Sequence, residues 1–252
     1  MKFIGLLLAF FCLLPLFFNI SLEKNPVYNN VELFDPSLSK INSISKLIHY
    51  ADSSAAHDHI KDGSLGYAVL VSCIIRKRFY HGFSNYTLQQ NWVAAIAQYC
   101  FGLSLASPVN PNEILQYPYA GCSQQAIVLM ETMKQKNIPY RSVGFPHHYA
   151  TELNFKNTWY FFDPNMEPEI KVKERNHNKW KGSADNLKKY YNGNCTYLDW
   201  TFGKSAPPIF GVPNAAPAPR ASFFQAATKF LSKIFWIFPL IFFVYPRTNN
   251  PK

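Results

Sequence analysis

Three side chains in the middle of the chain have the types that a cysteine nucleophile requires: Cys122, His148 and Asp163. A thiolate attacks a carbonyl carbon, an imidazole moves the proton, and a carboxylate fixes the tautomer of that imidazole. The sequence therefore predicts acyl transfer through a thioester. In this hypothesis Cys122 is the nucleophile, His148 the general base and acid, and Asp163 the residue that orients His148.

The residues that follow Gly121 have the period of a helix that begins at Cys122. Its apolar face is formed by Cys122, Ala126, Leu129, Met130 and Met133. Asn137 can close the helix in the left-handed conformation, and Pro139 prevents its continuation. The thiol is thus expected at a helix N-terminus, where unpaired amides and the helix dipole favour an anion. The backbone amide of Cys122 is the expected donor to the oxyanion.

Three strand-like segments follow this helix, at 140–145, 149–155 and 159–162. Lys156 and Asn157 make a plausible two-residue hairpin loop, which would pair Phe155 with Thr158. In that register His148 and Asp163 are diagonal neighbours on one face of the sheet. A loop of odd length would instead turn His147 to this face, so the choice of histidine depends on the register.

Four short motifs occur here in order: Gly121-Cys122, Asn137-Ile138-Pro139-Tyr140-Arg141, His148-Tyr149-Ala150-Thr151-Glu152 and Trp159-Tyr160-Phe161-Phe162-Asp163-Pro164. This series resembles the transglutaminase-like superfamily, which has a papain-like core, and the resemblance covers roughly residues 60–170. The family spacing His-x-x-x-Glu independently selects His148. One departure is Ser123, because the family often has an aromatic residue directly after the cysteine.

The resemblance implies an α+β domain in which helices pack on an antiparallel sheet. It also implies a peptide, a protein or another amide-bearing molecule as the substrate, with either water or an amine completing the reaction. Some family members use an upstream aromatic residue or glutamine near the oxyanion, and Trp92, Asn91 or Gln90 would fit that role here. For Trp92 core packing is the favoured interpretation. No cofactor is expected.

The charge of the chain is concentrated at its ends. The net charge is +10, but all 15 acids lie between Glu23 and Asp199. Six of the 25 basic residues lie in the terminal segments: Lys2, Arg220, Lys229, Lys233, Arg247 and Lys252. The central part is only mildly basic, which argues against a nucleic-acid partner and suggests that the terminal charges flank membrane segments.

The apolar ends predict a domain held at a cell membrane or envelope, with the catalytic part outside. We expect a signal peptide or uncleaved anchor at 1–20, a transglutaminase-like domain at 21–204 and a Pro/Ala-rich linker at 205–222. A hydrophobic membrane segment at 223–245 and a short basic tail at 246–252 would complete the chain.

The remaining cysteines and histidines do not predict a metal site. None of the five cysteines forms a Cys-x-x-Cys pair, and His57, His59 and Asp62 lack convincing ligand spacing. Cys73 with Cys100 is the disulfide to consider in an oxidising compartment, and free thiols are the equal alternative. The alternative function is a catalytically inactive binding or structural module that keeps the same fold and is tethered at the cell envelope.

Overall fold

The computed structural model describes residues 2–29, 32–102, 105–168, 170–205 and 207–244, which form two compact units. The larger unit comprises residues 26–84 and 109–217, and the smaller unit comprises 1–25, 85–108 and 218–252. The predicted domain at 21–204 therefore has different boundaries, because residues 85–108 belong to the smaller unit. The prediction of a mixed helix and sheet fold with an antiparallel sheet is confirmed.

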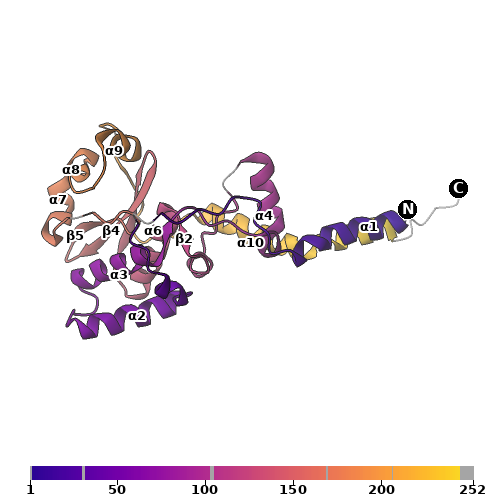
Figure 1. Cartoon of the computed structure of the whole chain (residues 1–252), viewed down its shortest axis with the longest axis horizontal. Coiled ribbons are helices and arrows are strands. Elements are labelled where there is room, and N and C mark those ends of the chain that lie inside the picture. Colours follow the sequence, from indigo (N-terminus) through magenta and orange to yellow (C-terminus); the bar gives the residue numbers. More distant parts are fainter. Residues whose placement is uncertain (1, 30–31, 103–104, 169, 206, 245–252) are drawn as a thin grey trace. The chain divides into compact units, whose positions relative to one another are not determined.

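The larger unit is built around a four-stranded antiparallel sheet with the strand order β5-β4-β3-β6 (Figure 1). Its strands are β3 (Tyr140–Phe145), β4 (His148–Phe155), β5 (Thr158–Phe162) and β6 (Ile209–Phe210). A separate parallel pair joins β1 (Tyr80–His81) to β2 (Tyr119–Ala120), directly before the helix that carries Cys122.

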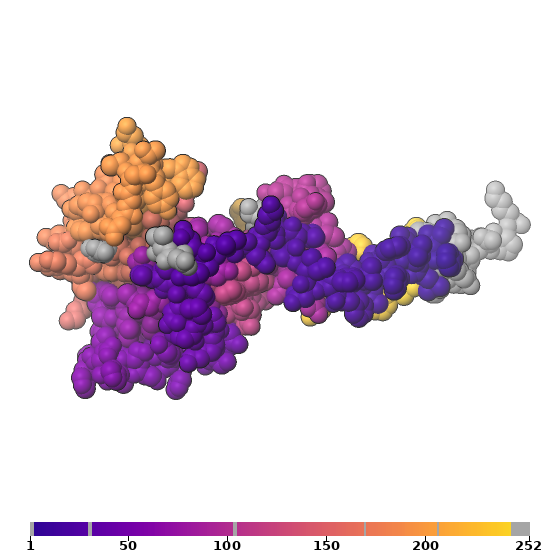
Figure 2. Space-filling model, in the orientation of Figure 1, coloured from indigo at the N-terminus to yellow at the C-terminus, as the bar shows by residue number. Residues whose placement is uncertain are grey.

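Each face of the sheet contributes to its own hydrophobic cluster, because successive side chains of a strand alternate. Tyr140, Leu153 and Phe162 join the cluster of α2 (Ile44–His57), α3 (Leu65–Arg78) and α6 (Cys122–Gln135). Val143 and Phe161 join the cluster of α7 (His177–Trp180), α8 (Ala184–Lys188) and α9 (Cys195–Phe202). In Figure 2 the surfaces of α2–α3 (purple) and α8–α9 (orange) lie at opposite ends of this unit.

Short helices complete the larger unit: η2 (Pro36–Lys40), α5 (Pro111–Ile114) and η3 (Val172–Arg175). The helix caps follow local sequence. The Ser64 side chain accepts a hydrogen bond from the amide of Tyr67 at the start of α3, and Asn137 adopts a left-handed φ of 55° after α6. The conformation of Asn137 agrees with the helix end predicted from the sequence.

The β4–β5 hairpin has the predicted register. Phe155 pairs with Thr158, and the pairing continues to Thr151 and Phe162. The loop residues Lys156 and Asn157 have φ values of 50° and 60°, as the two central residues of a type I′ turn require. This turn matches the twist of the strands and thereby fixes which side chains share a face.

Relief of backbone strain at this turn gives a first prediction. Lys156 carries a Cβ in the left-handed region, which asparagine tolerates better than lysine. We expect Lys156→Asn to raise the free energy of unfolding by about 0.5–1 kcal/mol in urea denaturation. Lys156→Gln removes the same charge without relieving the backbone and should leave stability unchanged. Equal effects of both variants would contradict the backbone explanation.

The smaller unit consists of α1 (Lys2–Leu13), η1 (Leu14–Phe17), α4 (Leu88–Phe101), α10 (Pro219–Ile234) and α11 (Ile237–Val244). Helix α1 packs against α11, and α4 packs against α10. Buried polar contacts join the latter pair, since Asn91 donates to the Thr228 hydroxyl and Ser232 donates to Asn91. At the start of α4 the Gln90 side chain accepts a hydrogen bond from the amide of Thr87.

The predicted membrane segments need correction. Within the described ranges, no helix has both the length and the apolar character that a membrane span requires. A span needs about 20 residues, whereas α1 has 12 and α11 has 8. The transmembrane segment at 223–245, the membrane anchor at 1–20 and the location at a membrane or envelope were inferred from apolar runs and are overturned by this finding.

The segment predicted as a linker, 205–222, is partly ordered within the larger unit. Strand β6 pairs Ile209 and Phe210 with β3, and the Asn214 side chain accepts a hydrogen bond from the amide of Tyr140. Helix α10 begins within the same segment, at Pro219. The reason is that β3 offers unpaired backbone groups at its edge, which this segment satisfies. The predicted basic tail at 246–252 lies outside the described residues.

Candidate active site

Cys122 occupies the first position of α6, as the sequence predicts. The Gln124 side chain fixes this helix start, because its Oε1 accepts hydrogen bonds from the amides of Gly121 and Ser84, each at 3.1 Å. Gly121 is required here for close approach: a Cβ at this position would lie 2.5 Å from the Phe83 ring. Thus Gly121 lets an aromatic ring pack directly beside the nucleophile candidate.

The hairpin brings His148 to Asp163. His148 is the first residue of β4, Asp163 follows β5, and the Nε2–Oδ2 distance between them is 2.6 Å. Both side chains are buried, with 3% and 0% of their surfaces exposed. Such burial requires that the carboxylate be satisfied by other donors as well.

Two further donors satisfy Asp163. The Tyr191 hydroxyl donates to Oδ2 at 2.7 Å, and the Met166 amide donates to Oδ1 at 3.1 Å. Burial raises the pKa of Asp163, but the charge of His148 and these hydrogen bonds lower that pKa by more, so it lies below its ordinary value. The carboxylate is therefore ionised at neutral pH. Tyr191 was not predicted as a site residue, because it lies in a turn and belongs to no sequence motif.

Cys122 lies close enough to His148 to raise the pKa of its imidazole. Because Nε2 contacts Asp163, Nδ1 is the ring nitrogen left for the sulfur. Burial lowers the pKa of His148, yet the Asp163 carboxylate and Cys122 together raise that pKa to about 10. Phe145 stacks on the imidazole and the edge of Phe202 meets it, at centroid distances of 6.3 and 5.3 Å. The imidazolium is thus enclosed by aromatic rings and one carboxylate.

The raised pKa of His148 predicts a pH-dependent stability. Because the folded pKa of about 10 exceeds the ordinary 6.5, the contribution is fully present below pH 6.5 and is lost as pH rises through 10. The loss is at most roughly 1.4 kcal/mol per pH unit. We expect urea unfolding to show a larger loss of stability in this pH range for the wild-type protein than for His148→Asn, whose side chain does not titrate. Equal losses would contradict the assignment.

His147 lies outside this arrangement. Its ring stacks on Trp200 with a centroid distance of 4.3 Å and an interplanar angle of 3°, and its amide donates to the carbonyl of Thr201. The reason is that His147 lies in the turn between β3 and β4, whereas His148 is the first residue of β4. Of the two histidines, His148 is the one brought to Cys122 and Asp163.

The other two motif residues, Arg141 and Glu152, pair with each other across β3 and β4. Arg141 donates from Nε and from a terminal nitrogen to Oε2 of Glu152, at 2.8 and 2.6 Å. His177 contacts Oε1 at 2.8 Å, and Glu152 is fully buried. A buried ion pair of this kind holds the two strands in register on the face that also carries His148.

Gln90 and Trp92, the upstream candidates for oxyanion or substrate binding, belong to the smaller unit. The Gln90 side chain accepts from the amide of Thr87 at 2.8 Å and caps α4. The Trp92 indole donates to the carbonyl of Ser232 at 2.9 Å and packs edge-on against Phe235. Both side chains are engaged in their own unit, and their role near an oxyanion stays a prediction.

All five cysteines are free thiols in the structure. Cys100 and Cys195 are exposed, whereas Cys122 is half-buried. These exposed thiols provide internal references for the reactivity of Cys122.

No family model, no curated protein and no solved structure matches this chain. The chemical interpretation of the site therefore rests on its own geometry.

Proposed function

We propose that this chain is a cysteine enzyme with a transglutaminase-like core that cleaves or exchanges amide bonds. The observation that carries the proposal is that Cys122, at the start of α6, lies beside His148, whose imidazole contacts the buried Asp163 carboxylate. An imidazole beside a sulfur, oriented by a third group, is the arrangement that makes a cysteine thiol nucleophilic. The order of helix, then strands, supports the family assignment.

In the proposed reaction the sulfur of Cys122 attacks the carbonyl carbon of an amide. The new S–C bond forms as the C–N bond breaks, and His148 gives its proton to the departing amine. The first amide of α6 has no acceptor within its helix and is placed to donate to the oxyanion. The product of this half-reaction is a thioester on Cys122.

The second half-reaction resolves the thioester. His148 takes a proton from the incoming water or amine, whose oxygen or nitrogen bonds to the carbonyl carbon as the S–C bond breaks. Cys122 leaves as a thiolate beside the protonated His148. Water gives hydrolysis and an amine gives transamidation. We favour hydrolysis because water is always present. Asp163 keeps the imidazole in one orientation through both steps. A peptide, a protein or another amide-bearing molecule is the proposed substrate class.

The proposal is tested by the rate of iodoacetamide alkylation at pH 7, read by peptide mass spectrometry. Exposure alone would make Cys100 and Cys195 react faster than the half-buried Cys122. We expect the reverse order, with Cys122 at least about tenfold faster, because thiolate character decides reactivity. A Cys122 that reacts more slowly than both exposed thiols in the folded protein would refute the enzyme and favour an inactive module.

A further inference from the structure

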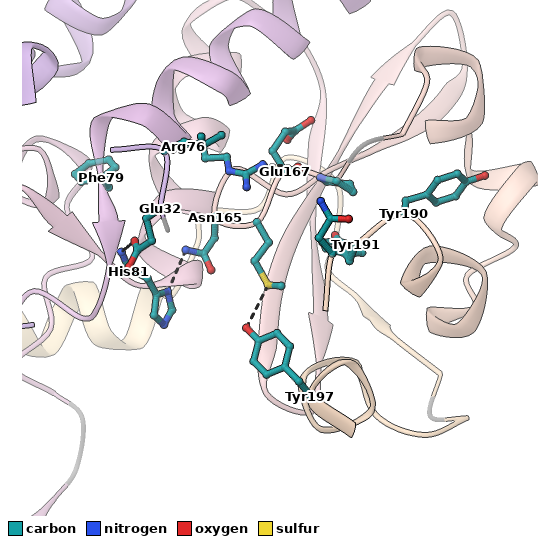
Figure 3. A pocket seen from close by; sticks show the side chains of 13 residues that line it. Glu32, Arg76, Phe79, His81, Asn165, Glu167, Tyr190, Tyr191 and Tyr197 are labelled. Carbon is teal, nitrogen blue, oxygen red and sulfur yellow. Dashed lines mark hydrogen bonds between the residues drawn. The ribbon is translucent and has the colours of Figure 1, made fainter. Parts of the chain in front are cut away.

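The larger unit contains a cavity of about 690 Å³ that the proposed reaction does not use (Figure 3). Its walls come from four parts of the chain: residues 32–33, residues 76–81, the loop after β5 at 165–168, and residues 190–197. Cys122, His148 and Asp163 do not line it. The volume falls in the usual range for small-molecule sites, about 300–1,000 Å³.

Two side chains of opposite charge line this cavity, Arg76 and Glu32. Among the residues that the structure describes, neither forms a salt bridge. One terminal nitrogen of Arg76 donates to the backbone carbonyl of Glu167 at 2.5 Å. Oε2 of Glu32 accepts from the backbone amide of His81 at 2.5 Å. The second terminal nitrogen of Arg76 can therefore donate to a bound ligand, and Oε1 of Glu32 can accept from one.

Two other ionisable groups of the lining, Glu167 and His81, add no unpaired charge to the cavity. Glu167 is buried, and its carboxylate is held by Arg175 and by the Ser72 hydroxyl. Desolvation lowers the pKa of His81 by more than the nearby Glu32 raises it, so this ring is neutral at pH 7. The His81 ring also contacts the Asn165 side chain at 3.1 Å. The cavity therefore presents one positive and one negative group.

Most of the remaining wall is aromatic or apolar, and Asn165 and Asn192 are its polar members. Phe79, Met166, Tyr191 and Tyr197 line it, and the Tyr197 hydroxyl meets the sulfur of Met166 at 3.9 Å, as the dashed line in Figure 3 marks. Tyr and Met side chains give large contact areas for apolar or aromatic groups. An occupant that fits this wall has an apolar side chain in addition to its charges.

We propose that this cavity binds a zwitterionic ligand of the amino-acid or short-peptide class. The ligand carboxylate lies at Arg76, its ammonium group at Glu32, and its apolar side chain against Phe79, Met166 and the tyrosines. A phosphate-bearing ligand would set an unpaired anion beside Glu32, and a neutral sugar would leave both charges without a partner, so these classes fit less well. The inference rests on the cavity and is independent of Cys122 chemistry.

The first test measures binding of L-alanyl-L-phenylalanine to the full chain with Cys122→Ser by isothermal titration calorimetry. The same dipeptide with an acetylated amine and with an amidated carboxylate gives the two blocked probes. We expect each block to weaken binding by about tenfold, because each removes one charge-assisted hydrogen bond. Equal affinities for blocked and unblocked dipeptides, or no binding of any of them, would overturn the proposal.

Variants then assign the two ends of the ligand. Arg76→Met should weaken binding of the free dipeptide about tenfold and leave binding of the amidated dipeptide unchanged. Glu32→Gln should weaken binding of the free dipeptide about tenfold and leave binding of the acetylated dipeptide unchanged. Lys77→Met, an exposed cation beside Arg76, is the matched control and should change neither. A weakening by Arg76→Met that is equal for free and amidated dipeptides would overturn the assignment. Should a variant fail to fold, the blocked probes on otherwise wild-type protein decide the outcome.

Failure of this proposal is distinguishable from failure of the catalytic one. Binding is read on Cys122→Ser protein, whereas the catalytic proposal is read from alkylation of Cys122. Binding with an unreactive Cys122 would support this cavity alone, and a reactive Cys122 without dipeptide binding would overturn this proposal alone.

Discussion

Replacing His148 with alanine should lower the alkylation rate of Cys122 by about 100-fold while the protein stays folded. The reason is that His148 is the ionisable group whose pKa is coupled to Cys122, and a positioned acid–base partner typically contributes 10²–10⁴-fold. The measurement is the alkylation rate of Cys122 relative to exposed Cys195 in the same sample, which cancels differences in reagent and pH. Circular dichroism reports folding.

The chain offers a matched control in the neighbouring histidine. His147 is exposed, stacks on Trp200 and does not contact the site, so His147→Ala should leave the relative rate unchanged. A larger effect from His147→Ala than from His148→Ala would show that the other histidine serves the thiol. An unchanged rate in His148→Ala would remove the basis for the proposed triad.

Replacing Asp163 with alanine should destabilise the protein by about 3–5 kcal/mol at neutral pH. The substitution leaves the buried, protonated His148 without its counterion, and removing one partner of a buried pair has costs of this size. Tyr191 would also lose the acceptor of its hydroxyl. Urea unfolding measures the change in the free energy of unfolding.

Two comparisons test this explanation. Asp199 is partly exposed and pairs with Lys188, so Asp199→Ala should cost less than about 1 kcal/mol. Adding His148→Ala to Asp163→Ala should restore part of the stability, because no uncompensated charge then remains buried. If Asp163→Ala lowered the free energy of unfolding no more than Asp199→Ala does, the Asp163 carboxylate would not be the group that stabilises protonated His148.

Tyr191 and the loop after β5 connect the candidate active site with the cavity. Tyr191 donates to Asp163 and also lines the cavity. The loop after β5 connects the two as well, since Asp163 begins it and residues 165–168 line the cavity. A ligand in the cavity would therefore lie near the Asp163 carboxylate.

The sequence alone predicted the parts of the site that depend on short segments. The helix that begins at Cys122 follows from its apolar period and from Asn137 and Pro139, which act within a few residues. The hairpin register follows from the two-residue loop at Lys156 and Asn157, and that register selects His148 and pairs it with Asp163. Such signals are local, so a single sequence is enough to read them.

The tertiary structure alone decided which distant residues complete the site. Tyr191, Phe145 and Phe202 surround Asp163 and His148, yet no spacing pattern marks them. The division into two units, with 85–108 apart from its sequence neighbours, was likewise not predictable from composition. The prediction of membrane segments at the two apolar ends was wrong, because an apolar run shows only that a segment avoids water. Whether it meets a bilayer or another helix, as α1 meets α11, depends on contacts between residues far apart in the sequence.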